Sequence, residues 1–276
     1  MRKIVISMVC LAIALAVVPA QAVPKAEAWD IWLEYDPGAV QTIDHSAWER
    51  FLVRYLRIGA DSVHRVAYGE VTPEDRAALD GYIDQLAAVP VGSYNRSEQM
   101  AYWINLYNAL TVRLVLDHYP IASIRDIDDD SPRPLSGGPW GEKLVEIDGV
   151  PVSLNDIVHR ILRPIFKDPR IHYALSCGAL SCANLQPEPY RGEVLDHQLS
   201  KAAMAYVNDR RCISLKDDEL SLSSLYRWYR EDFGGSDSAV IHHLMGLAAP
   251  RLAMSLQRFD RIDADAFDWR LNDATR

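Results

Sequence analysis

The chain has 276 residues and a net charge of −9 at neutral pH, and 49% of its residues are hydrophobic. At about 100 to 200 residues per domain, this length predicts one large domain or two small ones, with a substantial core. The acidic balance argues against nucleic acid as a partner, because a phosphate backbone is bound by clustered Lys and Arg. We therefore expect a globular protein that takes a small molecule or a peptide.

The N-terminal residues have the pattern of a secretory signal peptide. A basic start at residues 1–3 precedes an apolar stretch at 4–19, and the small-residue triplet at 20–22 provides a cleavage site. A membrane anchor is disfavoured, because the apolar stretch is shorter than the roughly 20 residues that a spanning helix needs. We expect residues 1–22 to be removed and residues 23–276 to form a single globular domain without a membrane span, periplasmic or secreted.

Helical patterns dominate the first half of the remaining chain. Residues 45–58 carry apolar side chains at helical spacing, and Thr72 with Pro73 predicts the start of a second helix. The longest apolar run, residues 100–116, contains one charged residue, Arg113. Its internal polar residues indicate a core helix instead of a membrane span.

Loop and strand signals follow. Residues 126–141 are rich in Asp, Pro and Gly and predict a surface loop. Residues 143–153 predict a hairpin around Asp148-Gly149. Ser153 then predicts the start of a helix that ends at Pro164.

The last part of the chain mixes both kinds of element. We predict, in chain order, a buried strand at 171–176, a small-residue loop at 177–182, a helix at 196–208, a second hairpin at 212–222, and helices at 226–233 and 240–256, the latter kinked at Pro250. The fold class is therefore α+β and helix-rich, with the two hairpins and the 171–176 strand in a small, mostly antiparallel sheet. Papain-like and transglutaminase-like folds share this general make-up.

Two asparagines on the long apolar helix, Asn105 and Asn108, lie three residues apart on one of its faces. A buried amide without hydrogen-bond partners costs roughly 1 to 3 kcal/mol. These side chains therefore either clamp neighbouring backbone, as most buried amides do, or orient a functional site.

His159 follows Asn155 and Asp156 by four and three residues, so one helical face can place an amide or a carboxylate beside the imidazole. This arrangement would fix the ring as a general base requires. The alternative is a half-exposed histidine beside a capping aspartate.

The segment 168–182 is the most informative. A cysteine on a Gly-containing turn after a strand can act as a nucleophile, with Cys177 first and Cys182 as the fallback. His172 is the nearest base, but five positions along a strand place it on the opposite face from Cys177 unless the chain bends. A base from elsewhere, such as His159, would then be required. A Cys177–Cys182 disulfide is an alternative that export favours, and it would silence both thiols. Zinc is a minor alternative, because the His-x4-Cys-x4-Cys spacing matches no standard pattern.

Five motifs in order resemble the domain-of-unknown-function 547 (DUF547) family over about residues 87–272. They are YWINLYNAL at 102–110, SLNDIVHRILR at 153–163, DPRIHYALSCGALSC at 168–182, WYREDF at 228–233 and FDWRLN at 267–272. The resemblance implies that the positions that matter are Asn105, Asn108, His159, His172, Cys177 and Cys182. The chain departs from the family pattern at Val158, where a glutamate is frequent, and at Ala183, where proline usually follows the cysteine.

Two hypotheses follow. The first is a cysteine-dependent hydrolase or acyltransferase acting on amide or peptide bonds without metal or cofactor. Cys177 is its nucleophile, His159 or His172 its base, and one of the two asparagines orients the base or the oxyanion. The second is a non-catalytic exported binding domain that contains a structural Cys177–Cys182 disulfide.

Overall fold

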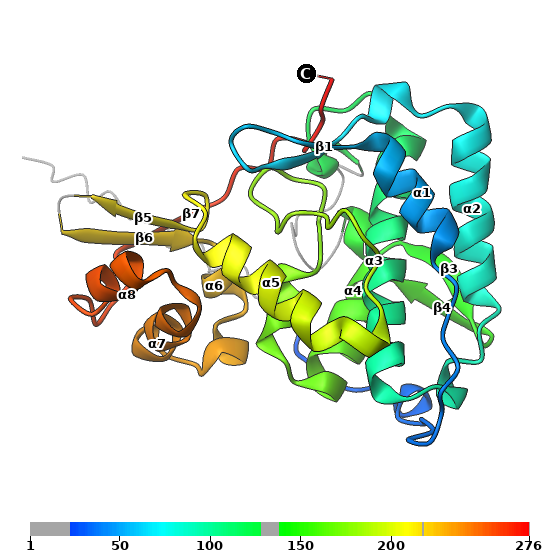
Figure 1. Cartoon of the computed structure of the whole chain (residues 1–276), viewed down its shortest axis with the longest axis horizontal. Coiled ribbons are helices and arrows are strands. Elements are labelled where there is room, and N and C mark those ends of the chain that lie inside the picture. The colour runs from blue at the N-terminus through cyan, green and yellow to red at the C-terminus, as the bar shows by residue number, and fades with distance from the viewer. Residues whose placement is uncertain (1–22, 128–137, 217, 276) are drawn as a thin grey trace, which may run out of the picture.

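The computed structural model describes residues 23–127, 138–216 and 218–275 (Figure 1). The expected signal peptide and most of the predicted 126–141 loop lie outside these residues. In the described part of the chain, no helix is both long and apolar enough to cross a membrane.

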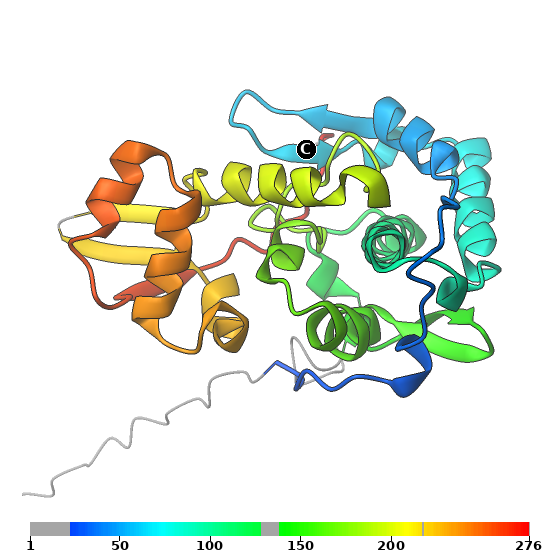
Figure 2. The ribbon, with the colours of Figure 1, turned by 60° about the horizontal axis from the view of Figure 1, so that its bottom comes forward.

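The molecule has a larger and a smaller part, each with its own cluster of buried hydrophobic side chains (Figures 1 and 2). The larger part contains α1 (Ser46–Tyr55), α2 (Pro73–Ala87), α3 (Arg96–His118), α4 (Leu154–Asp156), β1 (Leu56–Ile58), β2 (His64–Val66), β3 (Lys143–Ile147) and β4 (Val150–Ser153). The smaller part contains α6 (Leu225–Trp228), α7 (Asp237–Leu247), α8 (Pro250–Leu256), β5 (Ile213–Lys216), β6 (Glu219–Ser223) and β7 (Ala264–Ala266), and α5 (Leu195–Val207) extends from it toward the larger part. The helix-rich α+β class is confirmed.

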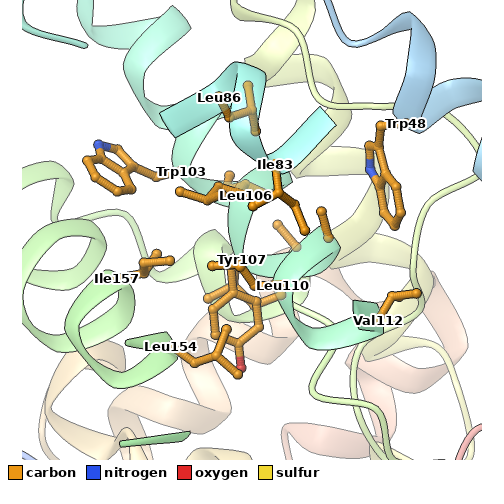
Figure 3. Close-up of a cluster of buried hydrophobic side chains, with 14 of the residues drawn as sticks. Trp48, Ile83, Leu86, Trp103, Leu106, Tyr107, Leu110, Val112, Leu154 and Ile157 are labelled. Carbon is orange, nitrogen blue, oxygen red and sulfur yellow. The ribbon is translucent and has the colours of Figure 1, made fainter. Parts of the chain in front are cut away.

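Helix α3 forms the centre of the larger part. Asn95 caps it by accepting a hydrogen bond from the N–H of Glu98, and nearly every side chain from Glu98 to Leu116 is buried. Leu106 and Leu110 on α3 lie among side chains of α1, α2 and α4 in Figure 3. The prediction of a core helix here is confirmed, because a helix that is apolar on all sides must be covered on all sides.

Local turn and cap signals are also confirmed. Asp148 and Gly149 both have positive φ, 49° and 77°, as the tight turn between β3 and β4 requires. The second predicted hairpin is formed by β5 and β6, and Thr72 caps α2 by accepting from the N–H of Asp75.

The prediction that the hairpins share one sheet is wrong. The strands form three separate sheets, β1–β2, β3–β4 and β5–β6–β7, and β7 pairs with β6 in the parallel direction. The sequence pattern of a hairpin specifies which two strands pair within it. It does not specify which other strand pairs with the outer edge of the hairpin.

The predicted strand at residues 171–176 is absent. Asp168 accepts a hydrogen bond from the N–H of Arg170, Pro169 sits at the first helical position, and a 3-10 helix runs over Pro169–Tyr173. The backbone that follows is bonded to the side chain of Asn108 and not to a strand. The segment therefore forms a helical turn where its apolar composition predicted an extended strand.

Two predicted effects of proline are also corrected. The helix expected to end at Pro164 continues as a π-helix over Ile157–Phe166 and ends at Lys167, whose φ is 54°. The apolar face of this helix is buried, and this burial keeps the chain helical past Pro164. Pro250 begins α8 instead of kinking one long helix, so residues 240–256 fall in two helices.

The C-terminal segment returns from β7 to the larger part, where the chain ends beside β1 (Figures 1 and 2). On its way it bonds to the cysteine loop. The N–H groups of Leu180 and Ser181 donate to the carbonyl oxygens of Arg270 and Asp268 at 2.8 and 3.1 Å. The tail therefore fixes both its own aromatic residues and the loop that carries the cysteines.

Candidate functional site

One pocket gathers both cysteines of the loop and one of the candidate bases. It encloses about 630 Å³ of empty space including its mouth. We call it the aromatic pocket, and the residues that line it are Tyr107, Trp140, Asn155, Val158, His172, Leu175, Cys177, Cys182, Ala183, Leu225, Trp228, Tyr229, Phe267 and Trp269. Asn105, Asn108 and His159 are not among them.

The two sulfur atoms in the pocket wall are joined as a disulfide. The Cα atoms of Cys177 and Cys182 lie 5.7 Å apart, within the usual range for such a bond. Gly178 has a φ of 80°, and a Cβ there would contact Ile124 at 3.4 Å. The contact is an ordinary one, and it is the positive φ that favours a glycine in the turn between the cysteines.

The two cysteines differ in exposure. Cys177 is partly exposed, whereas Cys182 is buried and its Sγ accepts a hydrogen bond of 3.2 Å from the N–H of Ala179. Cys212, which is free, is buried away from the pocket, and burial raises its pKa to about 12. Cys177 is therefore the sulfur that a substrate or a reductant reaches most directly.

Both asparagines of α3 clamp backbone. The amide of Asn108 donates to the carbonyl of Ala174 at 3.0 Å and accepts from the N–H of Ser176 at 2.8 Å. Asn105 bonds in the same two-way manner to the backbone of Tyr190, at 2.7 and 2.9 Å. Asn108 therefore holds the chain directly before Cys177, while Asn105 holds a more distant loop.

His172 meets a carboxylate that comes from the smaller part of the molecule. Its Nε2 lies 2.7 Å from Oδ2 of Asp232, and its ring stacks on Tyr229 at a centroid distance of 4.0 Å. Because a 3-10 helix replaces the predicted strand, His172 and Cys177 line the same pocket. The expectation that strand geometry keeps them on opposite faces is therefore wrong.

Asp232 is shared with a buried arginine. Nε and Nη2 of Arg163 donate to its two carboxylate oxygens at 2.5 and 2.8 Å, a two-pronged pairing. Although burial of the carboxyl acts to raise its pKa, hydrogen bonds from His172 and Arg163 hold the pKa of Asp232 well below its ordinary value. Asp232 therefore stays charged beside the imidazole.

His159 does not line the pocket. It contacts Arg163, which pairs with this carboxylate. Arg163 Nη1 donates to its Nδ1 at 2.9 Å, whereas the expected neighbour Asp156 bonds to Ser153 and Lys143. Burial, with the positive charge of Arg163, lowers the pKa of His159 to about 3. Burial also lowers the pKa of His172, against the raising effect of Asp232. Both rings are therefore neutral near pH 7.

Sequence reasoning missed Asp232 and Arg163 as site residues. Both lie inside motifs that carried the family resemblance, Arg163 at the end of 153–163 and Asp232 within 228–233. Each shares its motif with other charged residues, so no signal in the sequence distinguished it from them. Among the described residues, no three His, Cys, Asp or Glu side chains converge as ligands of a metal ion would.

Comparison with known proteins gives a family and no activity. Residues 91–207 match the model of the family described as "Protein of unknown function, DUF547". This confirms the resemblance for that part of the chain, which contains the motifs at 102–110, 153–163 and 168–182. No curated protein sequence and no solved structure matches the chain.

Proposed function

We propose that this chain, a DUF547 family member through residues 91–207, is a cysteine-dependent hydrolase or acyltransferase acting on amide or peptide bonds. Cys177 is its nucleophile and His172 its base. The observation that carries the proposal is the aromatic pocket, whose wall combines both cysteines with a histidine backed by Asp232. A nucleophile, a base and a group that orients the base are the parts that such chemistry needs.

The contact with Asp232 supports a base role for His172. A charged carboxylate only accepts, so Nε2 of the neutral ring donates to it and Nδ1 has the free lone pair. Tyr229 and Phe233 pack on the ring with centroid distances of 4.0 and 5.5 Å. These contacts fix the imidazole in one orientation and one tautomer.

The reaction would proceed in two halves. The Cys177 thiol transfers its proton to Nδ1 of His172 and its sulfur attacks the carbonyl carbon, which moves an electron pair onto the oxygen. Collapse of this intermediate breaks the bond to the leaving amine, which takes the proton from His172 and leaves a thioester on Cys177. In the second half, water in a hydrolase, or an amine or alcohol in an acyltransferase, gives a proton to Nδ1 of His172 and attacks the thioester carbonyl. The C–S bond then breaks, the acyl product leaves, and the Cys177 sulfur takes the proton back from His172.

The disulfide makes this activity dependent on reduction. In the structure Cys177 and Cys182 are bonded, so neither sulfur is a nucleophile. A dithiol reductant would attack the more exposed Cys177, become a disulfide itself and leave two thiols in the pocket. If the N-terminal segment directs export, as its pattern predicts, the chain enters a compartment where such a disulfide persists, so a dithiol donor in that compartment must reduce it before the reaction takes place.

The disulfide itself favours a second candidate, the non-catalytic exported binding domain. In that case the bond is a permanent brace of the loop 177–182, and the pocket only holds a ligand. The two candidates differ in what the sulfur atoms do after mild reduction.

Alkylation of the reduced protein, followed by mass spectrometry across pH, separates these candidates. We expect Cys177 to react fastest, Cys212 to stay protected as an internal control, and the variant His172→Asn to slow Cys177 alone. A disulfide that resists mild reduction in the folded protein would reject the enzyme and leave the binding domain.

A further inference from the structure

Four aromatic rings form a continuous wall on one side of the aromatic pocket. Trp228, Phe267 and Trp269 lie with ring centroids 4.8, 5.5 and 4.6 Å apart, and Trp140 meets Trp269 at 5.7 Å. They come from three segments that are distant in sequence, and the bonds between the tail and the cysteine loop hold two of them in place. The rings therefore present one apolar surface beside the disulfide.

Three of these rings are not fully covered. Trp228, Phe267 and Trp269 are only partly buried, whereas the core tryptophans Trp48 and Trp103 are each 1% exposed. Large apolar groups left open in a concave surface are typical of ligand sites. All three rings line the same pocket as Cys177 and His172.

The lining of the pocket restricts the ligand chemistry. No Lys, Arg, Asp or Glu is among the described residues that line it, so a charged group would lose its hydration without gaining a counter-charge. A sugar would need a hydrogen-bond partner for each hydroxyl, and apart from the tyrosine hydroxyls and the indole N–H groups of the tryptophans the polar lining side chains are Asn155 and His172. The surface suits a neutral apolar group.

We propose that the aromatic pocket binds the acyl part of the substrate and selects a neutral hydrophobic acyl group, an alkyl chain or an aryl ring. This inference rests on the proposed function and names its substrate class. The acyl carbonyl lies at Cys177 and the apolar remainder packs on the rings of Trp228, Phe267 and Trp269. Polar and charged acyl groups are excluded.

A binding experiment tests the pocket without requiring turnover. The probe is N-phenyl-1-naphthylamine, an uncharged apolar fluorophore, added to the full chain with its disulfide intact. Removing one ring costs apolar contact, so we expect Trp228→Ala and Phe267→Ala each to weaken binding about tenfold. Phe267 is partly exposed on the tail, which makes its variant the one that folds most readily. Tyr35→Ala, an aromatic removal outside the pocket, is the matched control and should leave binding unchanged.

A second experiment uses the reduced chain and two esters, p-nitrophenyl acetate and p-nitrophenyl hexanoate. Each added methylene that is buried favours the longer ester, so kcat/KM should rise at least about tenfold from acetate to hexanoate. Probe binding that both variants weaken, without turnover of either ester, supports the apolar site and overturns the proposed function alone. Turnover without preference for hexanoate, or probe binding unchanged in both variants, overturns the assignment of the pocket.

Discussion

Nε2 of His172 lies 2.7 Å from Oδ2 of Asp232, a residue 60 positions further along the chain, and the same carboxylate pairs with Arg163. The Arg163 side chain is 6% exposed and that of Asp232 19%, so neither charge is well solvated. We expect Asp232→Asn to lower the free energy of unfolding by about 3 kcal/mol, because Arg163 would keep a buried charge without its partner. Urea unfolding measures this loss.

The matched control for that variant is Glu70→Gln, which removes the carboxylate of an exposed pair with Arg57 at a similar distance, 2.8 Å. Exposed pairs contribute less than about 1 kcal/mol, so this variant should unfold almost as the parent does. Equal losses in the two variants would contradict the view that Asp232 is the anchor of a buried network.

Asn108 should be essential to the shape of the cysteine loop. Asn108→Ala would leave the carbonyl of Ala174 and the N–H of Ser176 buried without their partner, at a cost of about 2 to 3 kcal/mol in unfolding free energy. Asn208→Ala is the control, because Asn208 also bonds to backbone but is exposed, and water can replace it. A loss at Asn108 no greater than at Asn208 would rule out the clamp.

Reduction of the Cys177–Cys182 disulfide should weaken the fold only modestly. The cysteines are 5 positions apart in sequence, and closing so short a loop is worth about 2 kcal/mol in the chain-entropy model. We expect the reduced protein to stay folded, with a single cooperative transition at lower urea concentration. Global unfolding on reduction would mean that the bond is a structural brace, and would favour the binding domain over the enzyme.

The stability of the protein should fall as the pH drops below 6.5. Burial, assisted by the positive charge of Arg191, lowers the pKa of His45 from 6.5 to about 4. Between these values the unfolded chain binds a proton that the folded one does not, so unfolding is favoured by about 2 kcal/mol at pH 5. Urea unfolding at pH 5 and pH 7.5 measures the difference.

His45→Gln should reduce this difference, leaving the shares contributed by His159 and His172, whose pKa values are also lowered by burial. The imidazole of His45 is fully buried against Tyr82, so the variant has lower stability at every pH, and only its slope with pH is informative. An unchanged slope would show that His45 does not carry the effect.

Elements set by neighbouring residues could be predicted from the sequence. The turn at Asp148-Gly149, the cap at Thr72 and the buried helix α3 each depend on side chains within a few positions of one another. The 3-10 helix at Pro169–Tyr173 had a local signal, Asp168 followed by Pro169, whereas the path of residues 174–176 could not be predicted, because their backbone is bonded to Asn108, more than 60 positions earlier.

The candidate site also contains some residues that could be predicted from local sequence and others that could not. Local motifs identified Cys177, Cys182 and His172, and the loop geometry brings them to one pocket. Asp232, which contacts His172, and the aromatic tail, which lines the pocket, are brought there by contacts between residues far apart in the chain, and the periodicity of hydrophobic residues does not predict such contacts. His159 matched the expected pattern of a base, yet Arg163 occupies its Nδ1 and the ring lies outside the pocket lining.

The proposal that Cys177 is the nucleophile is tested most directly by trapping an acyl-enzyme. The reduced chain is mixed with p-nitrophenyl hexanoate, quenched in acid, and its mass and modified residue are determined by mass spectrometry. We expect one hexanoyl group on Cys177, absent from the oxidised protein and from Cys177→Ala, and formed much more slowly in His172→Asn. Two results would contradict the roles of Cys177 as nucleophile and His172 as base. One is a reduced, folded protein that acquires no acyl group on Cys177, and the other is an acyl group that forms equally fast without His172.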